Sequence, residues 1–251
     1  MEKCQANNTI ITFFSQEENE IVIVSMVIPT RNEEATIGGI IDAVKPYGDE
    51  VLVVDGHSTD NTKQISLEHG ARYILDGGKG KGDGIRVGFR EAAGDIVVFI
   101  DADGSHVPAD IPKLVKPIAD NEAEMVIGCR MTGGSDELHG DLGKFIRYIG
   151  SMIITLIVNY RWKVRLTDIQ NGFRAVNRQA GLRTNLVENS FTIEQEMAMK
   201  FLRNGDRVMN IPSHEYARQA GISGISVSRV WFNYGWVVIK NVLGMTKSAK
   251  P

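Results

Sequence analysis

The chain has 251 residues, of which 43% are hydrophobic and 24% charged, and its formal net charge is −3 at pH 7. This balance fits one α/β domain with a substantial core, and the lack of a basic excess argues against nucleic-acid binding. Two distant cysteines, Cys4 and Cys129, do not indicate a disulfide framework, which favours a reducing cytosolic environment. Residues 1–20 are a polar extension without a basic and apolar leader, so we expect no signal peptide.

Through the first half of the chain, continuous apolar runs alternate regularly with segments whose apolar residues are spaced as on one face of a helix. Continuous apolar runs predict strands, and apolar residues three or four positions apart predict the helices between them. Strands are predicted at 21–29, 51–55, 72–75, 96–100 and 124–128, and helices at 33–47, 60–69, 83–93 and 109–121. Because fully apolar strands that alternate with helices are typical of parallel sheets, we expect a mostly parallel sheet covered on both faces.

Polar segments follow three of these strands, at 30–33, 55–60 and 101–103. Ligands of open α/β sheets bind at the carboxyl ends of the strands, so these segments predict a binding site. Asp101 and Asp103 place two carboxylates at the end of an apolar strand, and Gly104 permits the chain to turn there. Such oxygen ligands are typical of Mg²⁺ or Mn²⁺, which commonly accompany nucleotide phosphates. The alternative is a solvated acidic turn.

Three other residues are candidates for the same site. Asp55 is a candidate to accept a hydrogen bond from a nucleobase, or else to cap the next helix, a role that Asp60 suits better. Glu33 is a candidate ribose or base ligand, or a favourable charge at a helix N-terminus. Lys81 lies in a turn at 80–84 whose glycines would let the backbone approach a ligand, and it would supply charge to phosphate. The turn is not a Walker A motif.

The segment 144–162 predicts a helix with a narrow polar stripe on an otherwise apolar surface. It is too short and too interrupted to cross a membrane, so we expect an interfacial helix, with burial in the core or in a dimer as the alternative. The polar stripe contains Lys144, Arg147, Ser151, Thr155 and Asn159.

The segment 229–245 predicts a second amphipathic helix. Its aromatic residues favour headgroup depth and its basic residues favour anionic lipid, with packing against the sheet as the alternative. The spaced residues are Trp231, Tyr234, Val238, Val242 and Met245, flanked by Phe232 and Trp236, and the basic ones are Arg229, Lys240, Lys247 and Lys250. We therefore expect a peripheral protein on the cytoplasmic face of a membrane.

The ordered motifs of the chain resemble those of the inverting glycosyltransferases of family two. The matching segments are 27–33, 53–62, 80–82 with Arg86, and 101–103. Segments 103–108, 110–112 and 168–174, and a late segment from Glu196 to Gly221, resemble more narrowly the polyprenyl-phosphate hexosyltransferases, the dolichyl-phosphate mannose synthase-like group. The resemblance covers residues 22–224. The chain departs from it at Gly56, where the family often has a second carboxylate, and after Arg218, where a lysine is missing.

The resemblance implies a fold and a set of site residues. The fold is a single nucleotide-diphosphosugar transferase domain of the GT-A type, a seven-stranded mixed sheet between helices, here at 21–224 and followed by an amphipathic tail at 225–251. The implied metal ligands are Asp101 and Asp103, and the implied catalytic residues are Asp103, Arg218 and Lys81. The implied nucleotide-sugar ligands are Pro29, Thr30, Glu33, Asp55, Lys81, Asp101, Ala102, Asp103, Asp168 and Gln170, and those of an acceptor phosphate are Arg130, Arg147 and Arg218.

The implied reaction is metal-dependent, inverting transfer of a hexose from a nucleotide diphosphate sugar to a polyprenyl phosphate. GDP-mannose, UDP-glucose and UDP-N-acetylglucosamine are all candidate donors, and a homo-oligomer or a separate membrane subunit is a candidate partner. The alternatives are another acceptor, such as a saccharide or small molecule, and a non-catalytic scaffold that binds nucleotide sugars. A sugar nucleotidyltransferase is disfavoured, because residues 29–33 replace the Gly-x-Gly-x-Arg signature expected near the first strand.

Overall fold

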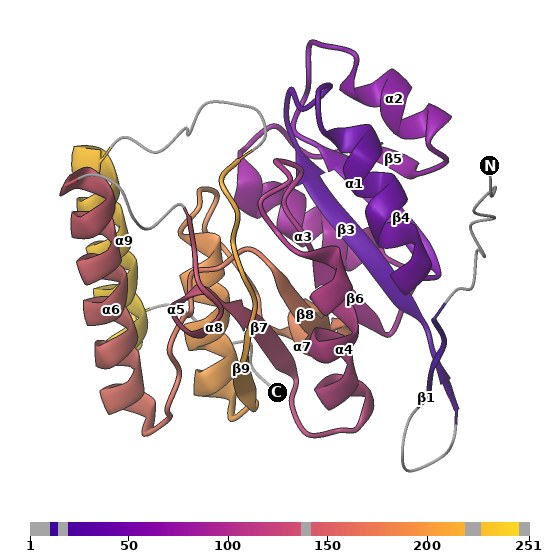
Figure 1. Ribbon diagram of the computed structural model, residues 1–251. Helices are drawn as coiled ribbons and strands as arrows, with labels where there is room; N and C mark the ends of the chain where they lie inside the picture. The colour runs from indigo at the N-terminus through magenta and orange to yellow at the C-terminus, as the bar shows by residue number, and fades with distance from the viewer. Residues whose placement is uncertain (1–10, 15–19, 137–141, 219–226, 246–251) are drawn as a thin grey trace.

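The computed structural model describes residues 11–14, 20–136, 142–218 and 227–245, without the side chains of 142–144, 147 and 227–232. A seven-stranded sheet runs through the molecule (Figure 1). Its strands, in spatial order, are β5 (Arg72–Leu75), β4 (Glu50–Asp55), β3 (Val24–Thr30), β6 (Ile96–Phe99), β8 (Arg174–Asn177), β7 (Met125–Cys129) and β9 (Val208–Pro212). All neighbours pair in parallel except β8, which is antiparallel to both β6 and β7. The predicted mixed sheet is therefore confirmed.

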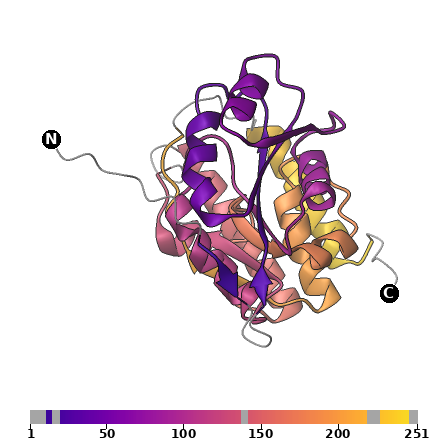
Figure 2. The same ribbon diagram turned by 90° about the vertical axis from the view of Figure 1, so that its right-hand side faces the viewer.

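Helices cover both faces of this sheet (Figure 2). Alternate side chains of each strand point to opposite faces, so β3 sends Val27 to one core and Met26 and Ile28 to the other. The helices are α1 (Ile37–Val44), α2 (Thr62–Glu68), α3 (Lys81–Glu91), α4 (Ile111–Ala119), α5 (Arg130–Gly133), α6 (Leu142–Trp162), α7 (Arg178–Arg183), α8 (Ile193–Asn204) and α9 (Val227–Val242). One core contains α1 and α4, and the other contains α3, α7 and α8.

The helix predicted at 33–47 begins only at Ile37, because the preceding loop is bound to the loop after β4. The backbone N–H of Asn32 donates to Ser58 Oγ at 2.7 Å, and that of Glu33 donates to Thr62 Oγ1 at 2.9 Å. Asp60 accepts from the N–H of Glu34 as well as from that of Thr62, so it joins the two loops. The N-cap position of α2 belongs to Asn61 and not to Asp60 as expected. Two strand-end loops are thereby held as one rigid unit.

Residues 13 and 14, within the predicted polar extension, form a short strand, β1 (Phe13–Phe14). It pairs antiparallel with β2 (Ile21–Val22), apart from the main sheet. The remainder of the extension at 1–10 and 15–19 lies outside the described residues. Within the described ranges, no helix has the length and apolar character that crossing a bilayer requires.

Helix α6 turns the described part of its polar stripe, from Ser151 to Asn159, toward the protein and its apolar stripe outward. Ser151 and Thr155 are 7% and 4% exposed. The Asn159 side chain accepts from the N–H of Leu166 and donates to its carbonyl oxygen, which fixes the end of the helix. On the opposite side Leu156 is 68% exposed. The side chains of Lys144 and Arg147 lie outside the described residues.

Helix α9 lies beside α6 and packs on α8 (Figure 1). Val237 and Val238 are buried in the core, whereas Trp236 and Ile239 are exposed. The alternative of packing on the domain therefore applies to one face of α9 only. Lys240, expected to meet lipid, pairs instead with Glu188 at 2.7 Å. The side chains of Arg229, Trp231 and Phe232, and residues 246–251, lie outside the described part of the chain.

Candidate active site

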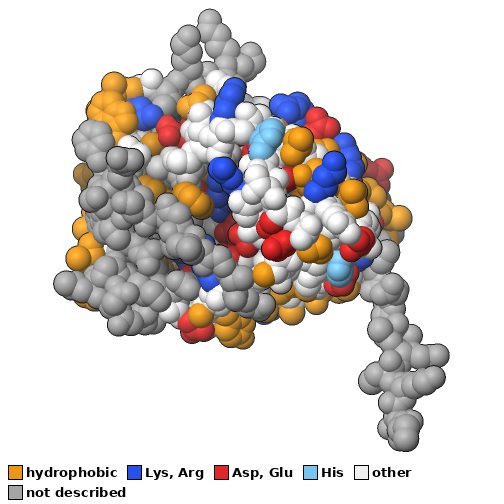
Figure 3. Space-filling view, turned by 90° about the horizontal axis from the view of Figure 1, so that it is seen from above, with side chains coloured by type: hydrophobic (Ala, Val, Ile, Leu, Met, Phe, Trp, Pro, Cys, Tyr) orange, Lys and Arg blue, Asp and Glu red, His pale blue; other side chains and the backbone are white. Residues whose placement is uncertain are grey.

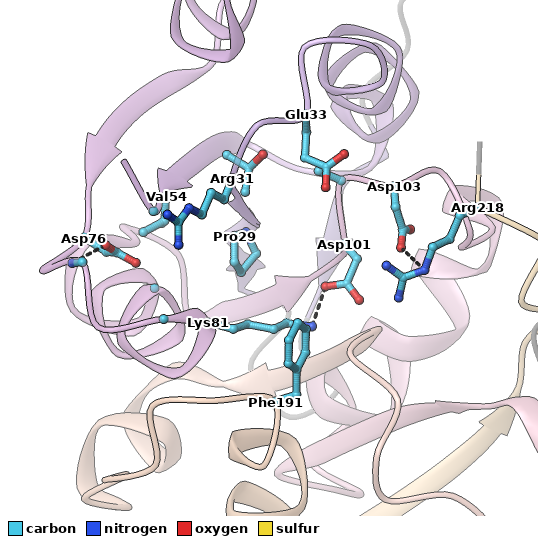
Figure 4. A pocket seen from close by; sticks show the side chains of 16 residues that line it. Pro29, Arg31, Glu33, Val54, Asp76, Lys81, Asp101, Asp103, Phe191 and Arg218 are labelled. Atoms are coloured by element: carbon cyan, nitrogen blue, oxygen red, sulfur yellow. Dashed lines mark hydrogen bonds and ion pairs between the residues drawn. The ribbon is translucent and has the colours of Figure 1, made fainter. Parts of the chain in front are cut away.

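A cavity of about 400 Å³ opens at the carboxyl ends of β3, β4, β5 and β6. Seen from above, it is a hollow with acidic and basic side chains at its mouth (Figure 3). Figure 4 shows it from close by. It is lined by Pro29, Thr30, Arg31, Glu33, Val54, Gly56, Asp76, Gly78, Gly80, Lys81, Gly84, Asp101, Ala102, Asp103, Phe191 and Arg218. Its size and position are those of a small-molecule site in an open α/β sheet.

The two predicted metal ligands meet in this cavity, and each is paired with a cation. Asp101 Oδ1 lies 2.7 Å from Lys81 Nζ, and Asp103 Oδ2 lies 3.3 Å from Arg218 Nε (Figure 4). Asp103 Oδ1 accepts from the backbone N–H and the hydroxyl of Ser105. Gly104, with φ of 76°, makes the turn that brings these groups together. Two carboxylates from the segment 101–103 and two cations, Lys81 and Arg218, therefore meet in one small volume.

Electrostatics keep both members of the Lys81–Asp101 pair charged. Burial opposes ionisation of Asp101, but Lys81 and then His106, whose Nε2 lies 3.5 Å from Oδ2, outweigh it and lower the pKa of the carboxyl. Burial likewise opposes the charge on Lys81, but Asp101 and Glu194 outweigh it and raise the pKa of the amine. Glu194 Oε1 lies 2.8 Å from Lys81 Nζ. Lys81 is thus fixed as a cation beneath the cavity.

Asp55 lies outside the cavity, although it was expected to meet a nucleobase. Its side chain is fully buried, and both oxygens accept from the backbone N–H of Ser58. The Ser58 hydroxyl adds a bond to Oδ1, and the Tyr73 hydroxyl adds one to Oδ2. Asp55 is therefore held on both oxygens by three donors of its own fold, and it joins β4, β5 and the loop between β4 and α2.

Arg130 and Asp168, expected to bind phosphate and sugar, are occupied with each other. Arg130 Nε donates to Asp168 Oδ2 at 2.7 Å, and Nη2 donates to Oδ1 at 3.1 Å. Asp168 is fully buried, and Arg130 also pairs with Glu215 at 3.5 Å. Gln170 binds Gln195 at 2.9 Å. None of these residues is among those that line the cavity.

The rest of the motif at 168–174 supports the carboxylate loop from beneath. A Cβ on Gly172 would lie 2.7 Å from Asp101 Oδ2, so only glycine leaves space for the carboxylate. Phe173 stacks on His106, with ring centroids 5.2 Å apart. Arg174, which is 1% exposed, donates to the backbone carbonyls of Asn171 and Glu194. The motif is therefore a brace for the site.

The glycines at the start of α3 are explained by close packing within the protein. A Cβ on Gly82 would lie 2.1 Å from the carbonyl oxygen of Glu188, and one on Gly80 would lie 2.6 Å from that of Asn189. Of the two, only Gly80 lines the cavity. Arg86 joins the same contact by donating to the Glu188 carbonyl. This turn therefore packs on the loop before α8, and its contact with the cavity is through Gly80 and Gly84.

Comparison with known sequences assigns the family. Residues 25–181, more than half of the chain, match the family described as Glycosyl transferase family 2. The chain belongs to this family. Over 203 residues it is 31% identical to the glycosyltransferase AglJ of Haloferax volcanii, an alignment that covers 79% of this chain and 64% of that protein. This glycosyltransferase therefore spans somewhat less than two thirds of that relative.

Two further likenesses concern sequence and fold. The chain is 28% identical, over 180 residues, to a Methanococcus voltae protein named UDP-N-acetylglucosamine–dolichyl-phosphate N-acetylglucosaminyltransferase, covering 63% of this chain and 70% of that one. A solved structure of glucosyl-3-phosphoglycerate synthase from Mycobacterium tuberculosis, with Mn²⁺ and UDP-glucose, has a TM-score of 0.68. It is 23% identical and covers 90% of this chain and 81% of the solved one, which shows a shared fold. The predicted GT-A fold is confirmed.

Several lining residues of the glycosyltransferase were missed from the sequence. Asp76 follows β5, so the strand-end argument applied to β3, β4 and β6 would have found it as well. Phe191 comes from the turn before α8, and Glu194, which holds Lys81 but does not line the cavity, comes from the first turn of α8, a region without a clear periodic pattern. Of the remaining expected residues, Pro29, Thr30, Glu33, Ala102 and Arg218 do line the cavity. Arg147 has no described side chain, and Gly221 lies in the masked segment 219–226.

Glu194 is expected to position Lys81 in this glycosyltransferase. Replacing it by glutamine, Glu194→Gln, removes one of the two carboxylates that hold Nζ, so we expect a roughly tenfold fall in turnover with the fold retained. Steady-state kinetics and a thermal melt measure the two effects. Glu188→Gln is the control, because that carboxylate holds Lys240 instead. Equal losses in both variants would contradict a specific role for Glu194.

Proposed function

We propose that this glycosyltransferase transfers a hexose from a nucleotide diphosphate sugar to a polyprenyl phosphate, with inversion at the anomeric carbon. The observation that carries the proposal is the convergence of Asp101, Asp103, Lys81 and Arg218 in one cavity at the strand ends. The name of the Methanococcus voltae relative supports a nucleotide sugar donor and a dolichyl phosphate acceptor. The solved structure with UDP-glucose supports the donor in a related fold.

The carboxylates of Asp101 and Asp103 fit a divalent metal ion. Both line the cavity, and carboxylate oxygen is the ligand that Mg²⁺ and Mn²⁺ prefer. The described residues contain no group of three or more acidic, histidine or cysteine side chains placed to hold an ion. This agrees with an ion that binds one or two carboxylates and takes further ligands from substrate phosphates. When bound, the metal would offset charge on the departing nucleoside diphosphate.

Positioning and charge are the contributions of the chain to such a reaction. A phosphate monoester has a second pKa of about 6, so the acceptor is ionised near neutral pH and needs no general base. Lys81 is held rigidly beside Asp101, where it adds positive charge next to the donor diphosphate. Arg218 lies at the opposite end of the cavity from Asp76, where it is the candidate ligand for the acceptor phosphate (Figure 4).

Glu33 belongs to the same end of the cavity. Burial raises the pKa of its carboxyl, and the negative charge of Asp103 raises it further, against the opposing effects of the Thr36 hydroxyl and Arg218. The hydroxyl of Thr30, which also lines the cavity, is buried and has no hydrogen-bond partner among the described residues. Both are polar groups that ribose or sugar hydroxyls would satisfy, and we propose them as donor ligands.

The exposed apolar surface of α6 and α9 supports a lipid acceptor. The side chains at 145, 149, 152, 153 and 156 form one outward stripe on α6, because side chains three or four residues apart lie on the same face of a helix. Its exposed apolar residues are Phe145, Ile146, Ile149, Met152, Ile153, Leu156 and Ile157, joined by Trp236 and Ile239 on α9 and by Leu243 just after it. A surface of this kind is typical of a membrane or protein contact. We propose peripheral binding to the cytoplasmic face of a membrane.

A transfer assay tests the proposed function. Radiolabelled GDP-mannose, UDP-glucose and UDP-N-acetylglucosamine would each be incubated with the protein, Mn²⁺ and a polyprenyl phosphate. Label that enters the organic phase with one of these donors is the expected result. Phosphoglycerate would be offered as a soluble acceptor in parallel. Label on phosphoglycerate alone would overturn the lipid acceptor, and no transfer to any acceptor would favour a binding scaffold.

The membrane role predicts that Leu156→Ser combined with Trp236→Ser weakens sedimentation with anionic vesicles at least roughly tenfold, because both exposed apolar side chains are lost. Activity on a long-chain polyprenyl phosphate should fall, and activity on a short soluble prenyl phosphate should change little. The matched control is Leu67→Ser with Leu75→Ser, two exposed leucines of the opposite half of the domain. Normal vesicle binding by the first variant would instead favour a protein partner for this surface.

A further inference from the structure

We infer that Asp76 reads the nucleobase of the donor by accepting a hydrogen bond from a ring N–H group. The inference rests on the proposed nucleotide-sugar site and names the residue that selects its base. It assigns to the end of β5 a role that the family pattern would place on Asp55, at the end of β4. The argument has three parts: Asp55 is unable to take this role, Asp76 is placed to take it, and its chemistry admits only some bases.

Asp55 is buried away from the cavity and held on both oxygens by its own fold. The two oxygens share the Ser58 N–H, and each also accepts from a hydroxyl, that of Ser58 at Oδ1 and that of Tyr73 at Oδ2. Burial raises the pKa of Tyr73, and the bond to Asp55 raises it further, so the phenol remains protonated and continues to donate. A base could reach Asp55 only after these buried bonds broke, which would leave polar groups unpaired.

Asp76 occupies the corresponding place on the next strand and faces the cavity. It follows β5 directly, and its backbone N–H donates to the carbonyl of Asp55 at 3.0 Å, which fixes the two residues side by side. The N–H of Gly78 donates to Asp76 Oδ1 at 2.6 Å. No described residue donates a hydrogen bond to Oδ2, which lies over Gly84, where a Cβ would be 3.5 Å away. Oδ1 is therefore held by a backbone N–H, and Oδ2 faces Gly84, which has no side chain to block a ligand.

The surroundings of Asp76 leave its negative charge incompletely compensated. Its side chain is 3% exposed, and His57 Nε2 lies 3.8 Å from Oδ1. Burial raises the pKa of Asp76, and Asp83 adds to this, while the Gly78 N–H opposes it. A donor group from a ligand would stabilise the charged form and replace the missing partner. Val54 and Arg31 flank this end of the cavity (Figure 4). The apolar side chain of Val54 and the planar guanidinium of Arg31 are both suited to contact the face of a nucleobase.

The acceptor chemistry of Asp76 selects among bases. Uracil and guanine carry a hydrogen on the ring nitrogen of the edge used in base pairing, whereas cytosine and adenine present a bare ring nitrogen there. A carboxylate accepts from the first pair and is repelled by the lone pair of the second. Asp76 thus favours uridine and guanosine diphosphate sugars and disfavours those of cytidine and adenosine.

Titration calorimetry with UDP, GDP, CDP and ADP, at constant Mg²⁺, tests the inference. We expect the wild-type protein to bind UDP or GDP at least roughly tenfold more tightly than CDP and ADP. Asp76→Asn keeps an oxygen for the Gly78 N–H but loses the charge, and its added amide can donate to cytosine. It should therefore lose most of this preference. Asp76→Ser, which is smaller, should lose it as well, and thermal melts would verify that both variants fold.

Asp55→Asn separates the two aspartates. It should lower the melting temperature, because it disturbs buried bonds to Ser58 and Tyr73, and it should retain the base preference. A preference that survives in both Asp76 variants, or that disappears only in Asp55→Asn, would overturn the inference while leaving the proposed function intact. A folded wild-type protein that binds none of the four nucleotides would overturn both.

Discussion

Asp103→Asn should reduce sugar transfer at least about 100-fold while the protein stays folded. Asp103 contributes one of the two carboxylates proposed to hold the metal ion, and the amide keeps the size and the bonds to Ser105 but loses the charge that would hold the ion. Turnover and the melting temperature would be measured together over a Mn²⁺ titration. The wild-type melting temperature should rise with Mn²⁺ and a nucleoside diphosphate, and that of the variant should rise much less.

Asp120→Asn is the matched control for this experiment. Asp120 is a carboxylate at the end of α4 that pairs with Lys116 and does not line the cavity. Turnover and the metal response of this variant should equal those of the wild-type protein. An Asp103→Asn variant with near-normal turnover and an unchanged Mn²⁺ dependence would exclude Asp103 as a metal ligand.

Asp168→Asn should lower the free energy of unfolding by about 3 kcal/mol, because it leaves the Arg130 guanidinium inside the protein without its main counter-charge. For a domain of this size the melting temperature should fall by roughly 10 °C. Burial opposes ionisation of Asp168, but Arg130 outweighs it and lowers the pKa of the carboxyl. A lowered folded-state pKa stabilises the protein above the unfolded-state value, and this contribution disappears as the pH falls through the acid range. The variant should therefore be less sensitive to acid.

The comparison is Glu124→Gln, which breaks the exposed pair of Glu124 with Arg207 at 2.6 Å. Solvent screens that pair, so the loss of stability should be much smaller. This result would assign Arg130 and Asp168 to the support of the fold. An Asp168→Asn protein with a normal melting temperature and a selective loss of transfer would contradict that assignment and return both residues to the substrate site.

The strands of the first half and the carboxylate loop were predictable because their signals are local. The apolar run at 96–100 predicts a buried strand without reference to distant residues. The glycine after Asp103 likewise permits a turn whatever packs around it. The second half was less readable for a physical reason. β8 begins with Arg174, which is buried because backbone carbonyls satisfy its guanidinium. α8 buries Glu196 and Lys200 as an ion pair at 2.9 Å. Burial of paired charges erases the amphipathic pattern on which a sequence-based prediction depends.

The sequence alone determined the α/β class, the family resemblance and the two cavity carboxylates that follow β6, Asp101 and Asp103. The tertiary structure decided which of the polar residues reach that cavity. Asp55 and Asp168 have the same chemistry as Asp76 and Asp103, but Tyr73, Ser58 and Arg130 occupy their oxygens. It also decided that Ser151 and Thr155 of the polar stripe of α6 face inward. A carboxylate can bind a substrate only where the fold brings it to the wall of the cavity, and that depends on partners brought from distant parts of the chain.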